Sequence, residues 1–320
     1  MNLLFLSSGR RYKLLEYFTK EFKGFGKIIA VDYDRLAPSL YVADNYYNVP
    51  KIDDERYIDI IKDICKRENI KGIISLIDPE LSILARHIDD FKEMGVTCFL
   101  SNYESIEICF NKYKMYKFLT DNNFKCAKTY IDFEEFKNDY TLRKINFPVI
   151  VKPICGSASI GINKVYTLEE VEFLLGKFPN LIIQDYLDGI EIGVDAYVDM
   201  ISKETVSIFA KEKIRLRSGE TDKSKSYKSD KLFNLVIELI SDLKLVGPID
   251  IDMFKIGNEY YISEINPRFG GGYPHAYECG EDFTKLIRNN LSGVENKKNI
   301  GTYKDEIYAI KYDDILIKYV

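Results

Sequence analysis

The chain has 320 residues and a formal net charge of -5, with 46% hydrophobic and 30% charged residues. This composition is ordinary for a globular protein of two or three domains, and it excludes a disordered chain. The acidic balance argues against general nucleic-acid binding, and no apolar stretch reaches the length of a membrane span. We therefore expect a cytoplasmic protein that acts on small molecules, without nucleic-acid or membrane partners.

Cysteine and histidine usage narrows the chemistry further. The six cysteines show neither C-x-x-C nor zinc-ligand spacing, which indicates buried thiols in a reducing cytosol. The two histidines are His87 and His275, so a histidine-rich metal site is excluded. The apolar run near the amino terminus is too short for the core of a signal peptide.

Strand and helix patterns alternate through the first hundred residues. This alternation is typical of βαβ units and predicts a Rossmann-like parallel sheet. The expected strands are residues 3–6, 28–31, 72–76 and 97–100, and the expected helices are 13–22, 56–68 and 80–94.

Polar side chains follow the strands of this predicted sheet. The turn at residues 7–11 leads into a helix and could receive an anion at the helix N-terminus. It lacks the G-x-G-x-x-G motif of dinucleotide-binding folds, which argues against a nucleotide-linked oxidoreductase. Asp32 and Asp34 are either a ribose-binding pair or simple turn residues. Asp78 and Glu80 fit a helix N-terminus, and they would also lie at the ligand-binding edge of the sheet.

A basic helix is expected at residues 111–123, and a short apolar strand at 147–153 carries Lys152 near its end. A loop of small residues at 155–161 and a returning strand at 163–167 complete a predicted hairpin flap. Backbone N-H groups of such a flap can close over phosphates. It is not a Walker loop, because no Gly-Lys-Ser/Thr follows. The flap residues expected to contact phosphate are Gly156, Ser157, Ser159 and Gly161.

The second half of the chain predicts an antiparallel sheet, because apolar and polar residues alternate. The expected strands are 181–186, 191–198, 207–216, 247–254 and 260–265, with helices at 232–243 and 281–291. The polar segment 217–230 is expected to be a mobile loop over the active site. Residues 306–320 are expected to form a packed terminal hairpin.

The strand at 260–265 ends in a group of polar residues. Glu264, Asn266 and Arg268 stand at alternate positions, which places their side chains on one face. A carboxylate, an amide oxygen and a guanidinium can together hold a divalent cation and the phosphate oxygens that it bridges. The alternative is a strand that ends in a salt-bridged Asn-Pro turn.

The order and spacing of these motifs resemble the ATP-grasp superfamily. The resemblance covers residues 111–288. This segment is similar to a single ATP-grasp unit of the carbamoyl-phosphate synthase large subunit. It rests on Lys112, Lys152, the flap, Gln184, Asp185, Tyr186, Leu187, Glu191, Asp252, Glu264, Asn266 and Arg268. It implies a pre-ATP-grasp α/β domain at 1–108, a small subdomain with the flap at 109–183, and a large subdomain at 184–320. ATP would lie between the two subdomains.

The resemblance implies a nucleotide site. Lys152 would neutralise phosphate charge, and Lys112 would approach the same phosphates, although Lys114 and Lys117 lie on the same predicted helix. Glu191 would accept the ribose hydroxyls. The backbone segment that would hold adenine comprises Gln184, Asp185, Tyr186 and Leu187.

The resemblance also implies a metal site of Asp252, Glu264 and Asn266, whose hard oxygen ligands suit Mg²⁺ or Mn²⁺. Two ions are the family expectation. Arg268 would then face the γ-phosphate or the acyl phosphate formed from it.

A second basic group precedes the polar segment. Lys211 and Arg215, with Arg217, resemble the family segment that contacts phosphate or the acid substrate. The alternative is a solvated charged strand. His275 either contacts substrate or is a solvated or capping residue.

These expectations describe a ligase that uses ATP and Mg²⁺ to activate a carboxylate, or bicarbonate, as an acyl phosphate. An amine or ammonia would capture the acyl phosphate, with release of ADP and phosphate. The sequence is also compatible with a homodimer. Carbamoyl phosphate synthesis is disfavoured, because that enzyme's large subunit carries two such units. The alternative is a nucleotide-binding regulatory module without catalysis. The acid and the amine are not identifiable from the sequence.

Overall fold

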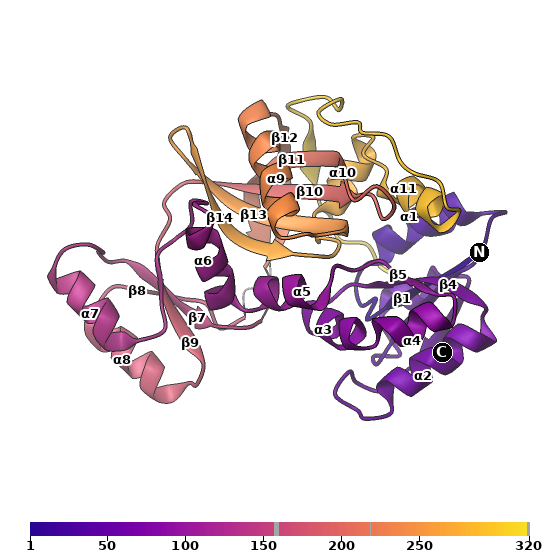
Figure 1. Ribbon diagram of the computed structural model, residues 1–320, viewed down its shortest axis with the longest axis horizontal. Coiled ribbons are helices and arrows are strands. Elements are labelled where there is room, and N and C mark those ends of the chain that lie inside the picture. Colours follow the sequence, from indigo (N-terminus) through magenta and orange to yellow (C-terminus); the bar gives the residue numbers. More distant parts are fainter. Residues whose placement is uncertain (157–159, 218, 319–320) are drawn as a thin grey trace.

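The computed structural model describes residues 1–156, 160–217 and 219–318, and these residues form three β-sheets (Figure 1). The four-stranded sheet and the amino-terminal sheet lie at opposite ends of the molecule, and the six-stranded sheet lies between and above them. This arrangement confirms the expected α/β and α+β fold class. The domain boundaries at 108/109 and 183/184 stay predictions.

The amino-terminal sheet is parallel, as predicted, with the order β3-β2-β1-β4-β5. Strands β1, β2 and β4 are almost fully buried, which explains their continuous apolar runs. The strands are β1 (Asn2–Leu6), β2 (Ile28–Asp32), β3 (Asn45–Asn48), β4 (Ile70–Ser75) and β5 (Thr97–Cys98). The helices are α1 (Tyr12–Phe22), α2 (Tyr57–Arg67), α3 (Asp78–Arg86) and α4 (Ile88–Glu93), with a 3₁₀ helix at Pro38–Tyr41.

Two features of this domain differ from the prediction. Strand β3 is absent from the expected strands, because its Asn-Tyr-Tyr-Asn sequence forms a half-exposed edge without an apolar run. The single helix expected at 80–94 is divided into α3 and α4, which meet at His87.

The next segment builds an antiparallel sheet with the order β6-β9-β7-β8. The pairing of β7 with β8 confirms the predicted hairpin around the flap. Ser157 and Ser159 lie outside the described residues. The strands are β6 (Thr129–Tyr130), β7 (Val149–Pro153), β8 (Asn163–Val165) and β9 (Leu181–Asp185). The helices are α5 (Tyr103–Phe110), α6 (Lys112–Asp121), α7 (Phe133–Thr141) and α8 (Leu168–Lys177).

The largest sheet has the order β14-β13-β10-β11-β12-β15 and is antiparallel at every pairing. Its β13–β14 pair confirms the predicted pairing beneath the Glu264 motif. The strands are β10 (Ile190–Val198), β11 (Thr205–Arg217), β12 (Glu220–Tyr227), β13 (Gly247–Ile256), β14 (Glu259–Asn266) and β15 (Tyr308–Ile310). The helices are α9 (Asp230–Asp242), α10 (Tyr273–Glu278) and α11 (Phe283–Leu291).

The prediction of a mobile loop at 217–230 is wrong. Residues Glu220–Tyr227 form β12, which pairs with β11 along its length. Its inward-facing residues include Ser224 and Ser226, which are small, polar and buried. Because these inward positions carry hydroxyl groups rather than aliphatic groups, the segment lacks the apolar alternation by which a strand is recognised.

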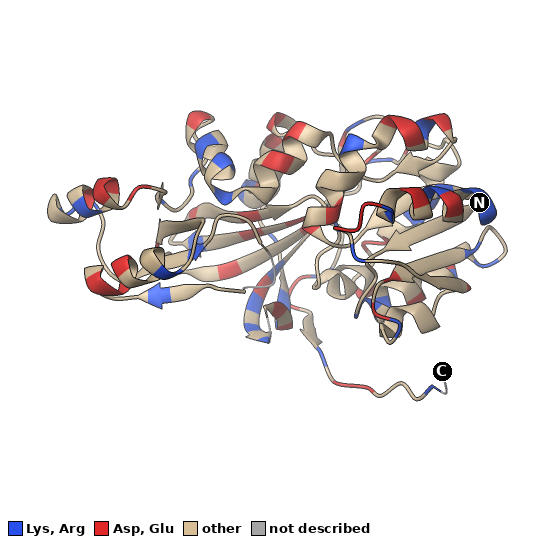
Figure 2. Cartoon of the chain, turned by 90° about the horizontal axis from the view of Figure 1, so that it is seen from below, with Lys and Arg blue, Asp and Glu red and all other residues tan. Residues whose placement is uncertain are grey.

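The predicted terminal hairpin is also wrong. Among residues 306–318, which the structure describes, only Tyr308–Ile310 are in a strand, β15, and this strand pairs with β12. The segment 311–318 has no regular secondary structure and extends away from the body of the molecule (Figure 2). Its apolar side chains, Tyr312, Ile315 and Ile317, are exposed, so alternation here does not mark a buried face. None of the helices in the described part of the chain has the length and apolar character that a bilayer span requires.

Candidate active site

The β13–β14 pair brings the predicted metal ligands together. Asp252 lies directly opposite Glu264, and Asp250 lies opposite Asn266. Directly opposite residues in an antiparallel pair project to the same face. Glu264 and Asn266 line a small cavity that Asp78 also borders. The strand pairing therefore places these oxygen atoms on one surface, as the sequence predicts.

Two buried lysines, Lys112 and Lys152, lie near Glu264, which lines this cavity. Lys112, at the start of α6, donates from Nζ to the Gly156 carbonyl at 2.8 Å, and Gly156 lines the same cavity. Burial lowers the pKa of Lys152 to about 8, with Glu264 opposing the shift and Lys112 adding to it. Burial raises the pKa of Glu264, and both lysines oppose that shift. We call Lys112, Lys152, Glu264 and Asn266 the lysine cluster.

The structure distinguishes Lys112 from its helical neighbours. Asn111 caps α6 by accepting from the N-H groups of Tyr113 and Lys114, which fixes Lys112 as the first helical residue. Lys114 points instead toward Glu107, at 3.9 Å, and Lys117 lies over the ring of Tyr113. Of these three lysines, Lys112 is the one that reaches the cavity.

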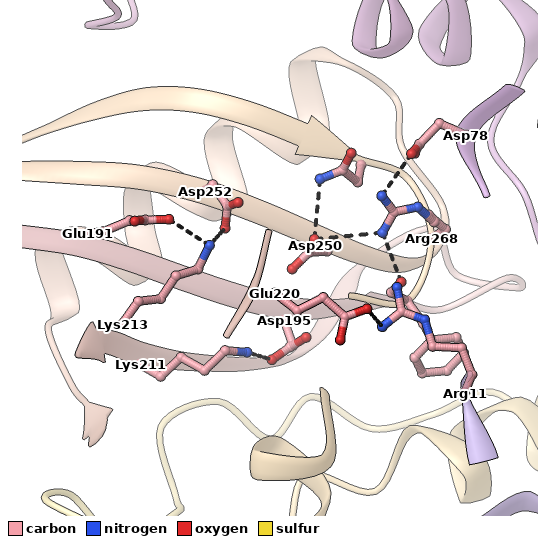
Figure 3. A network of polar contacts seen from close by, with 12 residues as sticks. Arg11, Asp78, Glu191, Asp195, Lys211, Lys213, Glu220, Asp250, Asp252 and Arg268 are labelled. Atoms are coloured by element: carbon pink, nitrogen blue, oxygen red, sulfur yellow. Dashed lines mark hydrogen bonds and ion pairs between the residues drawn. The ribbon is translucent and has the colours of Figure 1, made fainter. Parts of the chain in front are cut away.

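Arg268 occupies a network of paired charges just beyond β14 (Figure 3). Its Nη2 lies 2.8 Å from Asp78 Oδ2 and its Nη1 lies 3.8 Å from Asp250 Oδ2. Burial opposes the charge of Arg268, but Asp78 and Asp250 outweigh it and raise the pKa. Arg11 lies nearby and pairs with Glu220 at 3.4 Å. We call these five residues the arginine network.

The arginine network connects the amino-terminal domain with the large six-stranded sheet. Arg11 follows β1 and Asp78 begins α3, so both belong to the amino-terminal domain, while Glu220, Asp250 and Arg268 belong to the large sheet. Burial lowers the pKa of Arg11, with Glu220 opposing and Arg268 adding to the shift. The two guanidiniums are therefore near neighbours. The sequence does not predict a site role for Glu220, because the segment 217–230 that contains it is expected to be a loop.

Lys213 is a further buried residue that sequence reasoning misses. Its Nζ lies 2.6 Å from Asp252 Oδ1 and 2.8 Å from Glu191 Oε1 (Figure 3). Burial opposes its charge, but Asp252 and Glu191 outweigh it and raise the pKa of Lys213. The available signal is the alternation of Lys211, Lys213 and Arg215, which places all three on one face of β11.

Comparison with known proteins identifies the family. The model for the ATP-grasp domain matches residues 109–272, about half of the chain, and the model described as "PylC-like, N-terminal domain" matches residues 3–99. The chain belongs to the ATP-grasp family.

Curated relatives include synthases and formyltransferases of different lengths. The chain is 25% identical to the carbamoyl phosphate synthase large chain of Clostridium acetobutylicum over 80% of its own length, but it spans only 25% of that relative. It is 26% identical to the formate-dependent phosphoribosylglycinamide formyltransferase of Prochlorococcus marinus, covering 92% of this chain and 74% of the relative.

Solved structures share the fold at low identity. The N5-carboxyaminoimidazole synthetase of Staphylococcus aureus, complexed with ADP, superposes with a TM-score of 0.73 at 17% identity, covering 93% of this chain and 78% of that one. The biotin carboxylase of Campylobacter jejuni gives a TM-score of 0.75 at 15% identity, covering 96% and 74%. These likenesses confirm the ATP-grasp fold.

Two polar groups of the segment expected to hold adenine already have hydrogen-bond partners within the protein. The Gln184 side chain donates to Thr129 Oγ1 at 2.8 Å, so it supports the sheet. The N-H group of Asp185 donates to the Lys128 carbonyl at 2.9 Å. Tyr186 and Leu187 follow the end of β9, and their roles at the purine stay predictions.

The expected basic group on β11 is divided by the structure. Lys211 is fully buried and forms an ion pair with Asp195. Arg215 is largely exposed and lies 3.6 Å from Asp222. A β-bulge lies between Lys213 and Arg215, and the sheet buries Lys211 at one end of the strand and leaves Arg215 in solvent at the other. A joint role of Lys211 and Arg215 at the acid substrate stays a prediction.

Asp32 and Glu80 have structural partners. Asp32 accepts from the N-H groups of Gly9 and Asp34 at 2.7 and 2.9 Å, which supports its interpretation as a turn residue. Glu80 is fully buried and accepts hydrogen bonds from the hydroxyls of Ser7, Tyr57 and Ser75.

His275 also has structural partners. Its ring nitrogens contact Ser224 Oγ at 2.8 Å and the Ile307 carbonyl at 3.1 Å. Burial, with Lys211 adding, lowers the pKa of His275 to about 4. It is therefore a neutral buried residue, not a solvated one.

The predicted metal ligands fit a hard divalent cation. Within the described ranges, histidine, cysteine and carboxylate side chains alone form no group of three that could hold a metal ion. Asp252 and Glu264 supply two carboxylates, and the Asn266 amide completes the oxygen set on the same face. Because burial disfavours the charge of Glu264, a bound cation would offset an existing electrostatic cost.

Proposed function

We propose that this ATP-grasp protein is a ligase that uses ATP and Mg²⁺ to join a carboxylate, or bicarbonate, to an amine or ammonia. The observation that carries the proposal is the lysine cluster. Lys112 and Lys152 supply positive charge from one subdomain, and Glu264 and Asn266 supply oxygen ligands from the other. This combination suits a triphosphate held together with its metal ion.

The residues of the chain have separate tasks in this proposal. Lys112 and Lys152 bind phosphate oxygens, and the buried setting strengthens their effect because water is excluded. Asp252, Glu264 and Asn266 would hold the cation. A bound Mg²⁺ would offset the negative charge that develops during phosphoryl transfer.

The proposed reaction has two steps. A carboxylate oxygen of the substrate attacks the γ-phosphorus, the bond from that phosphorus to the ADP oxygen breaks, and ADP leaves. The amine nitrogen then attacks the acyl carbon of the acyl phosphate, phosphate leaves with one oxygen of the acid, and the nitrogen loses a proton. Neither step requires a protein nucleophile. Arg268 supplies positive charge beside Asn266, where we expect the transferred phosphoryl group.

The relatives and structural neighbours of the chain differ in their named activities. The chain spans a quarter of the carbamoyl phosphate synthase large chain but three quarters of the formyltransferase. One structural neighbour is named an L-amino acid ligase, from Bacillus licheniformis, with a TM-score of 0.70 at 17% identity. The name of this neighbour favours a dedicated carboxylate-amine ligase over carbamoyl phosphate synthesis.

The test is ADP release by the full chain with Mg-ATP and pooled acids and amines, with products identified by mass spectrometry. The expected result is stoichiometric ADP, phosphate and a new C-N product for one acid-amine pair. Lys152→Met should abolish turnover, and Lys114→Met should retain it, because Lys114 is exposed and lies away from the cavity. Mg-ATP binding without turnover in any pool would replace the ligase by a nucleotide-binding module.

A further inference from the structure

Helix α8 carries an aromatic side chain that the fold leaves in solvent. Of the large apolar side chains on the described helices, two are exposed, Tyr103 at 40% and Phe173 at 64%. Phe178, which directly follows α8, is exposed as well. Helices α7 and α8 lie at the end of the molecule opposite the amino-terminal domain (Figure 1). This surface contains no residue of the lysine cluster or the arginine network, so the proposed ATP site does not explain it.

The exposed face of α8 forms a shallow groove. The residues that line it are Glu169, Glu172, Phe173, Gly176 and Lys177. They recur at intervals of three and four residues, which places them on one side of the helix. The other side of α8 carries Val171, which is buried in the core of the small subdomain. One side of the helix is therefore packed, and the aromatic side has no covering element in the described chain.

The charges on this face are not paired within the chain. Among the residues that the structure describes, none forms a salt bridge with Glu169, Glu172 or Lys177. The Lys177 ammonium lies over the rings of Phe173 and Phe178, 5.5 and 5.3 Å from their centroids. Its stem therefore covers part of the aromatic surface while its charge stays available.

The spacing of these charges is symmetric about Phe173. Glu169 precedes it by four residues, and Lys177 follows it by four residues. When two copies of α8 pack antiparallel with a twofold axis at Phe173, each Glu169 meets Lys177 of the partner subunit and the two Phe173 rings meet each other. A twofold interface requires this kind of self-complementary surface. Gly176 helps the helices to approach, because it has no side chain and has open space above it.

We propose that the exposed face of α8 is a dimer interface and that its partner is a second copy of this chain, packed antiparallel. Burial of Phe173 and Phe178 stabilises the dimer, and the two Glu169–Lys177 pairs fix its register. One helix face is a small surface, so the dimer belongs to the weak class that buries less than about 1,200 Å² in total. The inference is independent of the proposed function.

The charge pattern allows a test by exchange. Sedimentation velocity of the full chain over a wide range of protein concentration should show a reversible dimer. Lys177→Glu places glutamates opposite each other at both symmetric contacts, and Glu169→Lys does the same with lysines, so each should raise the dimer Kd roughly tenfold or more. The double variant Glu169→Lys with Lys177→Glu exchanges the two charges and should restore the dimer. Phe173→Glu should abolish it.

A matched control is available on α7. Lys137 is also an exposed lysine of the small subdomain that lies over a phenylalanine ring, at 6.0 Å from the centroid of Phe133. Lys137→Glu makes the same change in charge outside the groove and should leave the dimer Kd unchanged. Circular dichroism confirms that the variants are folded, which is expected because all of the substituted side chains are exposed.

Three outcomes would overturn the proposal. The first is a monomer at every concentration of the unmodified protein. The second is a dimer that persists in Phe173→Glu, which would show that another surface is used. The third is a double variant as weak as the two single variants, which would exclude the antiparallel pairing of Glu169 with Lys177. None of these outcomes affects the ligase proposal, which the release of ADP tests separately.

Discussion

The lysine cluster and the arginine network are both buried and lie side by side, but their charges are balanced differently. Arg268 is held by Asp78 and Asp250, and Arg11 by Glu220, so positive and negative groups are paired within the network. In the described part of the chain, no carboxylate lies within ion-pair distance of Lys152, and burial lowers its pKa. A protein keeps a buried charge without a partner mainly where a ligand supplies one.

This difference predicts where a substitution mainly affects the stability of the fold and where it mainly affects nucleotide binding. The network connects the amino-terminal domain to the large sheet, and both of its guanidiniums have carboxylate partners, although in the described residues Asp78 Oδ1 and Arg268 Nε have no hydrogen-bond partner. The cluster has excess positive charge beside a cavity, together with oxygen atoms that suit a cation. Substitution of a residue of the arginine network should therefore lower the stability of the protein. Substitution of a lysine of the lysine cluster should lower its affinity for the nucleotide.

The largest effect is expected at Arg268. Arg268→Leu would leave the Asp78 carboxylate buried without its guanidinium partner. The free energy of unfolding should fall by about 3–5 kcal/mol, the usual result of breaking a buried ion pair from one side. Urea denaturation of the full chain measures this loss.

A double variant checks the cause. Arg268→Leu combined with Asp78→Asn removes both charges of the pair, so it should recover a large part of the lost stability. A loss below about 1 kcal/mol in Arg268→Leu alone would show that the network does not depend on this pairing.

Acid should destabilise the protein through His275, which, like Lys152, is buried where its charge is disfavoured. Its pKa lies at about 4, below its ordinary value of 6.5, so the folded protein binds fewer protons than the unfolded chain between these pH values. Stability is therefore complete above pH 6.5 and falls as the pH is lowered toward 4. The loss should total about 3 kcal/mol.

Denaturation curves from pH 7.5 to 4 measure this loss, with His275→Gln as the comparison. Glutamine is neutral throughout and can still donate to the Ile307 carbonyl and accept from Ser224. The free energy of unfolding of His275→Gln should therefore depend less steeply on pH between 6.5 and 4 than that of the unmodified protein. Equal slopes for the two proteins would show that another group titrates.

Lys152 should affect binding more than stability. Lys152→Met should raise the Kd for Mg-ATP roughly ten- to a hundredfold, because a hydrogen bond to a charged group contributes about 1.5–3 kcal/mol. Isothermal titration calorimetry measures the affinity. The free energy of unfolding should not fall, because the lysine is buried without an ion-pair partner in the described residues.

Lys114→Met is the matched control for this experiment. Lys114 is also a lysine near the start of α6, but it is exposed and 3.9 Å from Glu107. Its substitution should leave the Kd for Mg-ATP unchanged. A loss of stability in Lys152→Met as large as that in Arg268→Leu would contradict the distinction between cluster and network.

The smallest effect is expected at Arg215. It is largely exposed and lies 3.6 Å from Asp222, outside both groups of residues. Arg215→Ala should change the free energy of unfolding by less than about 1 kcal/mol, as is usual for surface ion pairs. The same variant tests the predicted contact with the acid substrate: an unchanged KM for the acid would remove Arg215 from the site.

Local patterns made part of the site predictable. Alternation along one strand places Glu264 and Asn266 on a common face, and the β7–β8 hairpin follows from two short apolar segments around a small-residue loop. The parallel sheet likewise follows from continuous apolar strands separated by helices. These inferences succeed because each depends on backbone geometry within a few residues.

Other features depend on contacts between distant segments. The sequence predicts a loop around Glu220 because β12 buries serine and threonine side chains, and this strand is formed by pairing with β11. The exposed tail at 311–318 shows the opposite error, since its apolar alternation faces no partner. Periodicity reports a possible face, but only packing determines whether that face is buried.

The family and the fold class follow from the sequence alone, because both depend on residue type and local spacing, while the phosphate, ribose and metal motifs stay predictions. The tertiary structure decided which charges are paired. It joined Arg268 to Asp78 across 190 positions and brought Lys213 over Gly193 to Asp252. The electrostatic energy of a buried charge depends on its neighbours in space, and local sequence does not specify those neighbours.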